Sequence, residues 1–336
     1  GLVTMQGVRH VTFRGFTFEC CQGTGLSIRD AEDVQIAGCV IRNTGAWAVE
    51  LSGRDSSVAG CDIYNTADGG VILSGGDRPS LTPANLSVDN CHIWRYGRWN
   101  PICKPAVQVN GVGNRVTHNL INDGPHMAIM WGGNDHVFEY NEIHSVVHSA
   151  NDAGIMYAGY DPAMRGHMIR HNYFHHVYGF QNRGCNGVYL DDMFCSATIY
   201  GNVFYKVPRA AFIGGGHDNV VENNIFVDCN PALHVDARMM NWAAASVPIM
   251  RERLEAVPYR EEPWRSRYPQ LLTYLDGNYA QPRTGSTRII QCRTDIGKFG
   301  IDTQTARNAF CVRLFSKFSI LRQRVESDMT TAIGYL

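Results

Sequence analysis

The stretch HVFEYNEI, from His136 to Ile143, contains the pattern that decides the fold. Apolar residues occupy its third and eighth positions, and an asparagine occupies the sixth. The same eight-residue phrase recurs along the chain, each copy beginning 22 to 31 residues after the last. The copies begin at Val11, Val34, Ser56, Leu86, Asn114, His136, His167, Ala197 and Asn219. A fixed phrase at such a spacing predicts a repeat protein.

A second, shorter motif follows each copy of the phrase. It consists of a small residue, an apolar residue, any residue and another apolar residue, as in AVEL from Ala48 to Leu51. Alternation at period two predicts a short β-strand with one buried face. One such coil cannot bury its apolar face alone, whereas stacked coils share a core. The sequence therefore predicts an all-β fold, a right-handed parallel β-helix of about nine coils.

The sixth position of the phrase predicts one column of this core. It reads Phe16, Cys39, Cys61, Cys91, Asn119, Asn141, Asn172, Asn202 and Asn224. We expect the asparagines to bond to neighbouring coils as an amide ladder, and the cysteines to fill the same column as thiols. The eleven cysteines include no CxxC pair and the thirteen histidines no HExxH motif. His175 and His176 are expected at a turn, so no metal or other cofactor is predicted.

The chain divides into three segments by pattern. Residues 1–242 are predicted to form the β-helix. Residues 243–276 change to helix-compatible spacing with aromatic anchors, and we expect them to pack on or cap the β-helix. Residues 277–336 lose the phrase and are predicted to form a C-terminal extension.

Charge and hydropathy argue against nucleic acid or a membrane as the partner. The formal net charge is -1, which gives no electrostatic basis for binding either. No apolar run approaches the roughly 20 residues that span a bilayer. The first residues, GLVTMQGV, show no signal peptide, so we expect a chain trimmed at that end. We expect a monomeric bacterial protein, secreted or periplasmic.

Longer coils indicate where a binding groove lies. Extra residues fall between the phrase and the second motif after Cys91, Asn141 and Asn172. These loops are expected to project from the same edge, and long loops on a rigid scaffold are where binding sites usually lie. A groove along stacked coils suits an extended polysaccharide.

Aligning the second motif across coils places the candidate residues. Lys104, His126 and Asp152 each lie two residues before the small residue, so they are predicted to stack on one rim. The third position of the motif is predicted to point outward and includes Met130, Met156, Tyr189, Phe212 and His234. The next outward position includes Gly132, Ala158, Asp191, Gly214 and Asp236.

The carboxylates of Asp152, Asp191 and Asp192 are the candidate catalytic groups. Paired carboxylates, one of them with a raised pKa, hydrolyse glycosidic bonds. An extended strand would separate Asp152 from Asp191 by roughly 15–20 Å, so the loop at Asp152 must fold back. The structural alternative is that Asp152 caps a turn and the other two end a strand. Substrate binding is assigned to Lys104, His126, Tyr189, His234 and Asp236.

Two other functions remain open. A polysaccharide lyase or epimerase acting on a uronate polymer would use Lys104 or His126 as base, with Ca²⁺ held by acidic residues. A cage of acidic residues with an arginine facing the groove would favour it. The third reading is a noncatalytic carbohydrate-binding β-helix, which needs no groove between Asp152 and Asp191.

Four segments resemble the β-helix proteins related to glycoside hydrolase family 141. They are NDAGIMYAGYD from Asn151, GVYLDDMF from Gly187, AFIGGGHDN from Ala211 and ALHVDAR from Ala232. The resemblance implies a right-handed parallel β-helix that degrades plant or algal polysaccharides. It also implies two catalytic aspartates about forty residues apart in neighbouring coils. Asp152 and the Asp191–Asp192 pair match that motif, with Asp191 favoured.

Overall fold

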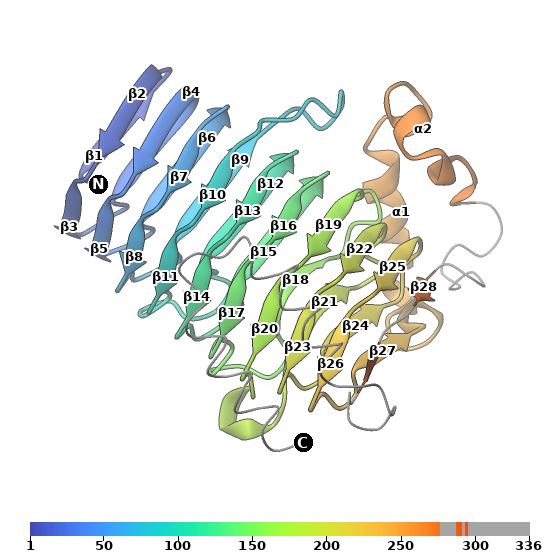
Figure 1. Ribbon diagram of the computed structural model, residues 1–336. Helices are drawn as coiled ribbons and strands as arrows, with labels where there is room; N and C mark the ends of the chain where they lie inside the picture. The colour runs from blue at the N-terminus through green and yellow to red at the C-terminus, as the bar shows by residue number, and fades with distance from the viewer. Residues whose placement is uncertain (276–286, 291–292, 295–336) are drawn as a thin grey trace.

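Parallel strands stacked side by side make up most of the structure (Figure 1). The computed structural model describes residues 1–275, 287–290 and 293–294. Within them, 19 strands join one sheet and 10 join a second. Among these residues no helix is both long enough and apolar enough to cross a membrane.

The larger sheet combines strands from the phrase with strands from the second motif. The phrase supplies β2 (Arg9–Arg14), β7 (Ser57–Ala59), β10 (Ser87–Asp89), β13 (Arg115–Thr117), β16 (Val137–Glu139), β19 (His167–Arg170), β22 (Ala197–Tyr200) and β25 (Asn219–Glu222). The second motif supplies β6 (Val49–Arg54), β9 (Val71–Gly75), β12 (Val107–Val112), β15 (Ile129–Asn134), β18 (Gly154–Gly159), β21 (Asn186–Asp191), β24 (Ala211–Gly214) and β27 (Leu233–Asp236). β1 (Val3–Gln6) and β4 (Leu26–Ala37) complete the N-terminal end, β4 running through both patterns.

The smaller sheet is built from the last residues of each phrase. Its strands are β3 (Thr17–Cys21), β5 (Val40–Thr44), β8 (Asp62–Tyr64), β11 (His92–Trp94), β14 (Leu120–Asn122), β17 (Glu142–His144), β20 (Tyr173–His175), β23 (Val203–Tyr205) and β26 (Ile225–Val227). In both sheets each strand pairs in parallel with the equivalent strand of the next coil, as between Val116 and Phe138. The phrase predicted this pairing because its third and eighth residues must meet in one shared core.

The column at the sixth position of the phrase is confirmed. Four successive amide-to-amide hydrogen bonds of 3.0 Å link Asn119, Asn141, Asn172, Asn202 and Asn224. Cys39, Cys61 and Cys91 continue the column as buried free thiols. The Cys91 amide donates to the Asn119 side chain at 2.8 Å, which joins the two halves of the ladder.

The predicted alignment of β18 is wrong by one residue. Met130 pairs with Tyr157 rather than with Met156, and Asp191 pairs with Gly159 rather than with Ala158. Met156 and Ala158 therefore face the core, where both are buried, and Tyr157 faces outward. An inward tyrosine would leave its hydroxyl without a polar partner, whereas the outward one reaches a carboxylate.

Short helices follow the last strand of the second motif. They are η2 (Arg238–Met240), η3 (Ala244–Ser246), α1 (Val247–Glu255), α2 (Trp264–Arg267) and η4 (Pro269–Thr273), whereas η1 (Phe180–Asn182) lies in a coil loop. Met250, Leu254 and Trp264 form a second apolar cluster with Met193 of the β-helix. The Trp264 indole donates to the Arg78 and Pro79 carbonyls at 3.0 Å, so the loop after β9 reaches α2 (Figure 1).

Two later strands rejoin the sheets. β28 (Thr287–Ile290) pairs with β25 and β29 (Arg293–Thr294) pairs with β26, both in parallel. TRIIQCRT, from Thr287, aligns with the phrase that begins at Asn219, and Ile289 pairs with Val221 at its third position, although its eighth residue is Thr rather than apolar. We missed it because the helical segment lengthens the interval far beyond the usual spacing. The rest of the predicted extension beyond residue 275 lies outside the described residues.

Candidate functional site

One outward-facing side chain from each of β18, β21, β24 and β27 contributes a ring to a continuous row. This aromatic row consists of Tyr157, Tyr189, Phe212 and His234, which pair in register from coil to coil. Ring centroids lie 5.4 Å apart for Tyr157 and Tyr189, 4.7 Å for Tyr189 and Phe212, and 4.6 Å for Phe212 and His234. Coils about 4.8 Å apart impose this stacking distance.

The next outward position holds carboxylates around one buried guanidinium. Arg238 donates from Nη1 to Asp191 and, at 3.2 Å, to Asp192. Its Nε and Nη2 donate to the two oxygens of Asp236, each at 3.1 Å. Only 3% of Arg238 is exposed. We call these four residues the Asp–Arg cluster; its three carboxylates outnumber its single cation.

A left-handed turn brings Asp192 to the same side as Asp191. Adjacent residues of a strand point to opposite faces, but β21 ends at Asp191 and Asp192 has φ 31°. Aspartate tolerates positive φ better than most residues. Burial of Asp192, reinforced by the charge of Asp191, raises the pKa of its carboxyl, although the Arg238 hydrogen bond opposes this shift. The protonated form of this carboxyl therefore persists to higher pH than that of an ordinary aspartate.

The aromatic row connects the cluster to Asp152. The Tyr157 hydroxyl donates to Asp191 at 3.0 Å, and the Tyr189 hydroxyl donates to Asp152 at 3.4 Å. Asp152 itself is exposed. Burial raises the pKa of both tyrosines, so their hydroxyls remain donors. Asp152 and Asp191 thus lie at the same strip of sheet, each bound by one of two neighbouring rings.

Lys104 and His126 lie apart from this cluster. Lys104 precedes β12, three coils from β21 or roughly 14 Å along the axis. It forms an ion pair with Asp68 at 3.1 Å and lies 5.5 Å from the Trp47 ring centroid. His126 is buried, which lowers its pKa. The shifted alignment of β18 also moves Asp152 one position away from their column.

Sequence reasoning missed Tyr157 and Arg238. Tyr157 was missed because the predicted alignment of β18 was shifted by one residue and placed Met156 at the outward position. Arg238 follows β27 in the sequence DAR, two residues after Asp236, and nothing in the strand pattern marks it. The signal that could have indicated Arg238 was Gly214. This glycine lies at an outward position between Asp191 and Asp236, where the lack of a side chain leaves room for another group.

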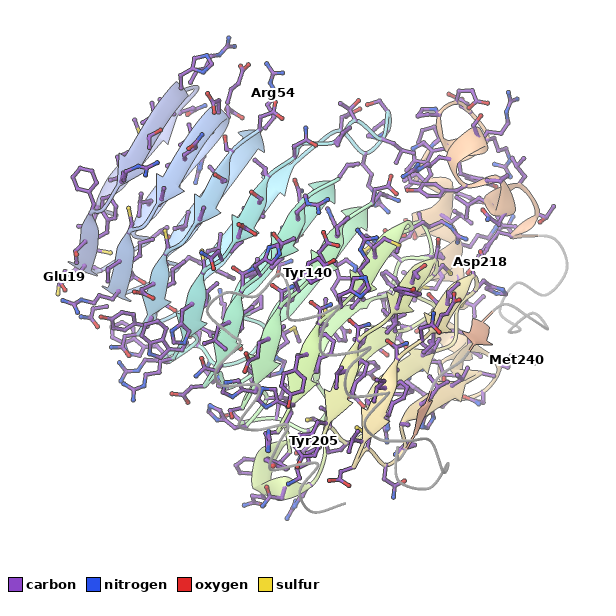
Figure 2. All side chains as sticks on the ribbon, viewed as in Figure 1. Glu19, Arg54, Tyr140, Tyr205, Asp218 and Met240 are labelled. Carbon is purple, nitrogen blue, oxygen red and sulfur yellow. The ribbon has the colours of Figure 1, made fainter. Side chains whose placement is uncertain are left out.

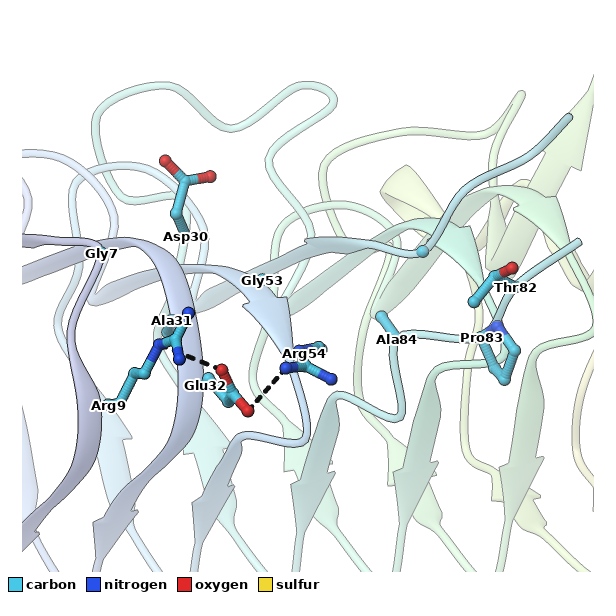
Figure 3. Close-up of a pocket in the computed structure, with 11 residues that line it drawn as sticks. Gly7, Arg9, Asp30, Ala31, Glu32, Gly53, Arg54, Thr82, Pro83 and Ala84 are labelled. Carbon is cyan, nitrogen blue, oxygen red and sulfur yellow. Dashed lines mark hydrogen bonds and ion pairs between the residues drawn. The ribbon is translucent and has the colours of Figure 1, made fainter. Parts of the chain in front are cut away.

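A polar hollow of about 450 Å³ lies elsewhere, at the N-terminal end of the β-helix. Figure 3 shows Glu32 between Arg9, at 3.1 Å, and Arg54, at 2.6 Å. Arg54 and Met240, which is close to Arg238 in sequence, lie at opposite ends of the molecule (Figure 2). Two acids line the hollow: Glu32 is paired with two arginines, and Asp30 accepts a hydrogen bond from Gln6 at 3.3 Å. The Asp–Arg cluster is the stronger candidate for chemistry, because burial raises the pKa of Asp192 there.

Gly214 is expected to be essential for the cluster. A Cβ atom at this position would lie 2.4 Å from Cζ of Arg238. Gly214→Ala should therefore displace the guanidinium and lower the free energy of unfolding by about 1–3 kcal/mol. Gly132→Ala is the matched control, because Gly132 occupies the equivalent outward position and its Cβ would meet nothing closer than 3.6 Å. Urea unfolding measures both, and equal stability of the two variants would contradict the assigned contact.

Comparison with known proteins establishes the class of the chain. A family model described as a right handed beta helix region matches residues 1–98 and 105–242. The chain belongs to this family, and its resemblance to right-handed β-helix proteins is confirmed.

Other comparisons are weaker. No curated protein matches. A solved structure titled as a glycoside hydrolase is similar at 15% sequence identity and a TM-score of 0.45, covering 64% of this chain. The match spans 41% of the length of that protein. Likeness at this level carries no argument about activity.

Proposed function

We propose that this protein is a glycoside hydrolase that cleaves a plant or algal polysaccharide with Asp191 and Asp192. The observation that carries the proposal is the asymmetry within the Asp–Arg cluster. Asp192 has a raised pKa, while Asp191 is bound by Arg238 and the Tyr157 hydroxyl. Two carboxyls with different roles, set by their surroundings, are what glycosidic cleavage requires.

The proposed reaction assigns each carboxyl one task. Asp192 donates its proton to the glycosidic oxygen, and Asp191 attacks the anomeric carbon to form a glycosyl ester as that bond breaks. Asp192 then removes a proton from the water that hydrolyses the ester. Arg238 and Tyr157 orient Asp191 and hold its charge during attack.

The arrangement favours retention of anomeric configuration. Asp191 and Asp192 accept hydrogen bonds from the same nitrogen, Nη1 of Arg238. Their carboxylates are therefore closer than the roughly 6.5–9.5 Å that inverting enzymes leave for a water.

The surrounding residues offer contacts for the sugar chain. Trp242 is 74% exposed, and its ring lies 5.6 Å from Cζ of Arg238, which makes it a stacking surface beside the cluster. Tyr189 and His234 extend the aromatic row, and Asp236 and Asp152 add acceptors for sugar hydroxyls. Lys104 would contact units further along the polymer, whereas the buried His126 is given no direct contact. Such substrates lie outside cells, so we propose a secreted or periplasmic location.

A uronate lyase or epimerase is the second candidate. The cage of three aspartates around Arg238 favours it, since the excess negative charge would attract Ca²⁺. Two features count against it. Arg238 is already occupied by carboxylates, and the proposed bases Lys104 and His126 lie coils away from the cage.

The test is incubation with a panel of plant and algal polysaccharides, with and without Ca²⁺. Hydrolysis should release reducing ends, and NMR of the first product should show retained anomeric configuration. Inversion would remove Asp191 as nucleophile and favour Asp152 as base. Unsaturated, ultraviolet-absorbing products would establish the lyase, and binding without any product would establish a noncatalytic protein.

A further inference from the structure

A second group of side chains suited to chemistry lies on the smaller sheet. Glu142 and His144 are two residues apart in β17, so both point to the same outer face. His175 in β20 pairs directly with His144. Coil stacking thus brings together one carboxylate and two imidazoles from two strands.

The three side chains are close enough to share an ion. One ligand atom from each lies within 4.8 Å of the other two. Nε2 of His175 is 3.1 Å from Oε1 of Glu142. The imidazoles of His144 and His175 stack with centroids 4.6 Å apart and an interplanar angle of 21°. Nδ1 of His176 lies 2.7 Å from Nδ1 of His175, which orients that ring from its other nitrogen.

We propose that Glu142, His144 and His175 form a zinc site that joins two coils of the β-helix. Two imidazoles and one carboxylate are a donor set that zinc prefers, with a water completing the tetrahedron. Tetrahedral zinc separates its ligand atoms by roughly 3.4 Å. Nε2 of His175 and Oε1 of Glu142, 3.1 Å apart, already lie close to that separation.

The surroundings fit this assignment. Glu142 and His175 are buried, while His144 is partly exposed and leaves a route for the ion and its water.

This site escaped the sequence analysis for a physical reason. Linear motifs such as HExxH place ligands within one element, whereas here the second imidazole comes from the next coil. The site also lies on a different sheet from the Asp–Arg cluster. We therefore assign it a structural role, independent of the proposed hydrolysis, in which ion binding stabilises the fold.

The experiment uses the full chain without a histidine tag, freed of metal by a chelator. Zn²⁺ should bind at one equivalent in calorimetry and raise the Tm, and Co²⁺ should give the visible absorption of a tetrahedral complex. His144→Ala and Glu142→Gln should each weaken Zn²⁺ binding at least ~10-fold, since loss of an outer-shell partner alone costs that much.

His10→Ala is the matched control. His10 is exposed and forms a comparable pair with Asp33 at 2.9 Å, and among the described residues it belongs to no group of three possible metal ligands. This variant should bind Zn²⁺ as the parent does. Circular dichroism establishes whether each variant is folded. If Glu142→Gln does not fold, His144→Ala, at a partly exposed position, is enough to test the site. Absence of saturable binding, or equal affinity in the parent and His144→Ala, would overturn the site.

Discussion

Asp192→Asn is expected to lower kcat/KM for polysaccharide hydrolysis by about 10²–10⁴-fold, the usual contribution of a general acid. The amide preserves the size of the side chain but has no proton to give to the glycosidic oxygen. Substrates with an activated aryl leaving group do not need that proton. Bond cleavage in them should therefore survive in this variant, which separates lost acid catalysis from lost folding.

Asp191→Asn should remove activity on both kinds of substrate, because the nucleophile itself is gone. Asp62→Asn, at an exposed strand position of the smaller sheet, is the control and should behave as the parent. The assignment fails if Asp191→Asn retains hydrolysis, or if Asp152→Asn has the larger effect. The second outcome would point to the exposed carboxylate bound by Tyr189.

The pH profile supplies a further readout of the same assignment. The pKa of Asp192 is raised chiefly by burial, so its acid form persists to higher pH than that of a free aspartate. Activity should fall as pH rises through that pKa, because the proton donor is lost. Asp192→Asn should abolish this limb, and an unchanged profile would assign the limb to another group.

Asn172→Ala is expected to lower the free energy of unfolding by about 3–5 kcal/mol, since each buried polar group left without its partner costs about 1–3 kcal/mol. Its side-chain oxygen accepts from the amide and the side chain of Asn141, both at 3.0 Å. Its side-chain nitrogen donates to the Phe138 carbonyl and to Asn202, also at 3.0 Å. Alanine supplies none of these bonds.

Urea unfolding measures this loss. Asn100→Ala, in an exposed loop where the side chain bonds to Asp68 at 2.6 Å, is the control and should change stability by less than about 0.5 kcal/mol. If Asn172→Ala lowers the free energy of unfolding by less than about 1 kcal/mol, the asparagine ladder is a consequence of the fold and does not stabilise it.

The sequence was sufficient for the fold because burial repeats with the coil. Phe138 must face the core in every arrangement of its coil, and Asn141 must find partners above and below, so a local phrase carries the pairing of whole sheets. The burial pattern did not predict the alignment where two choices buried apolar residues equally well. GIMY and IMYA in β18 both alternate, and the hydroxyl of Tyr157 decided between them through a partner one coil away.

Part of the site followed from the sequence pattern, and the rest was decided only by the tertiary structure. Asp191 and Asp236 were placed at one outward position by strand alternation alone, because side chains in a strand alternate with a period of two. Asp192 joins the site because the chain turns with positive φ at the end of β21. Arg238 joins it because the chain after β27 turns back and places the guanidinium over Gly214. Likewise, His144 and His175 meet because of the length of the intervening coil. Local pattern specifies which face a residue takes, whereas its neighbours across coils are set by the loops between them.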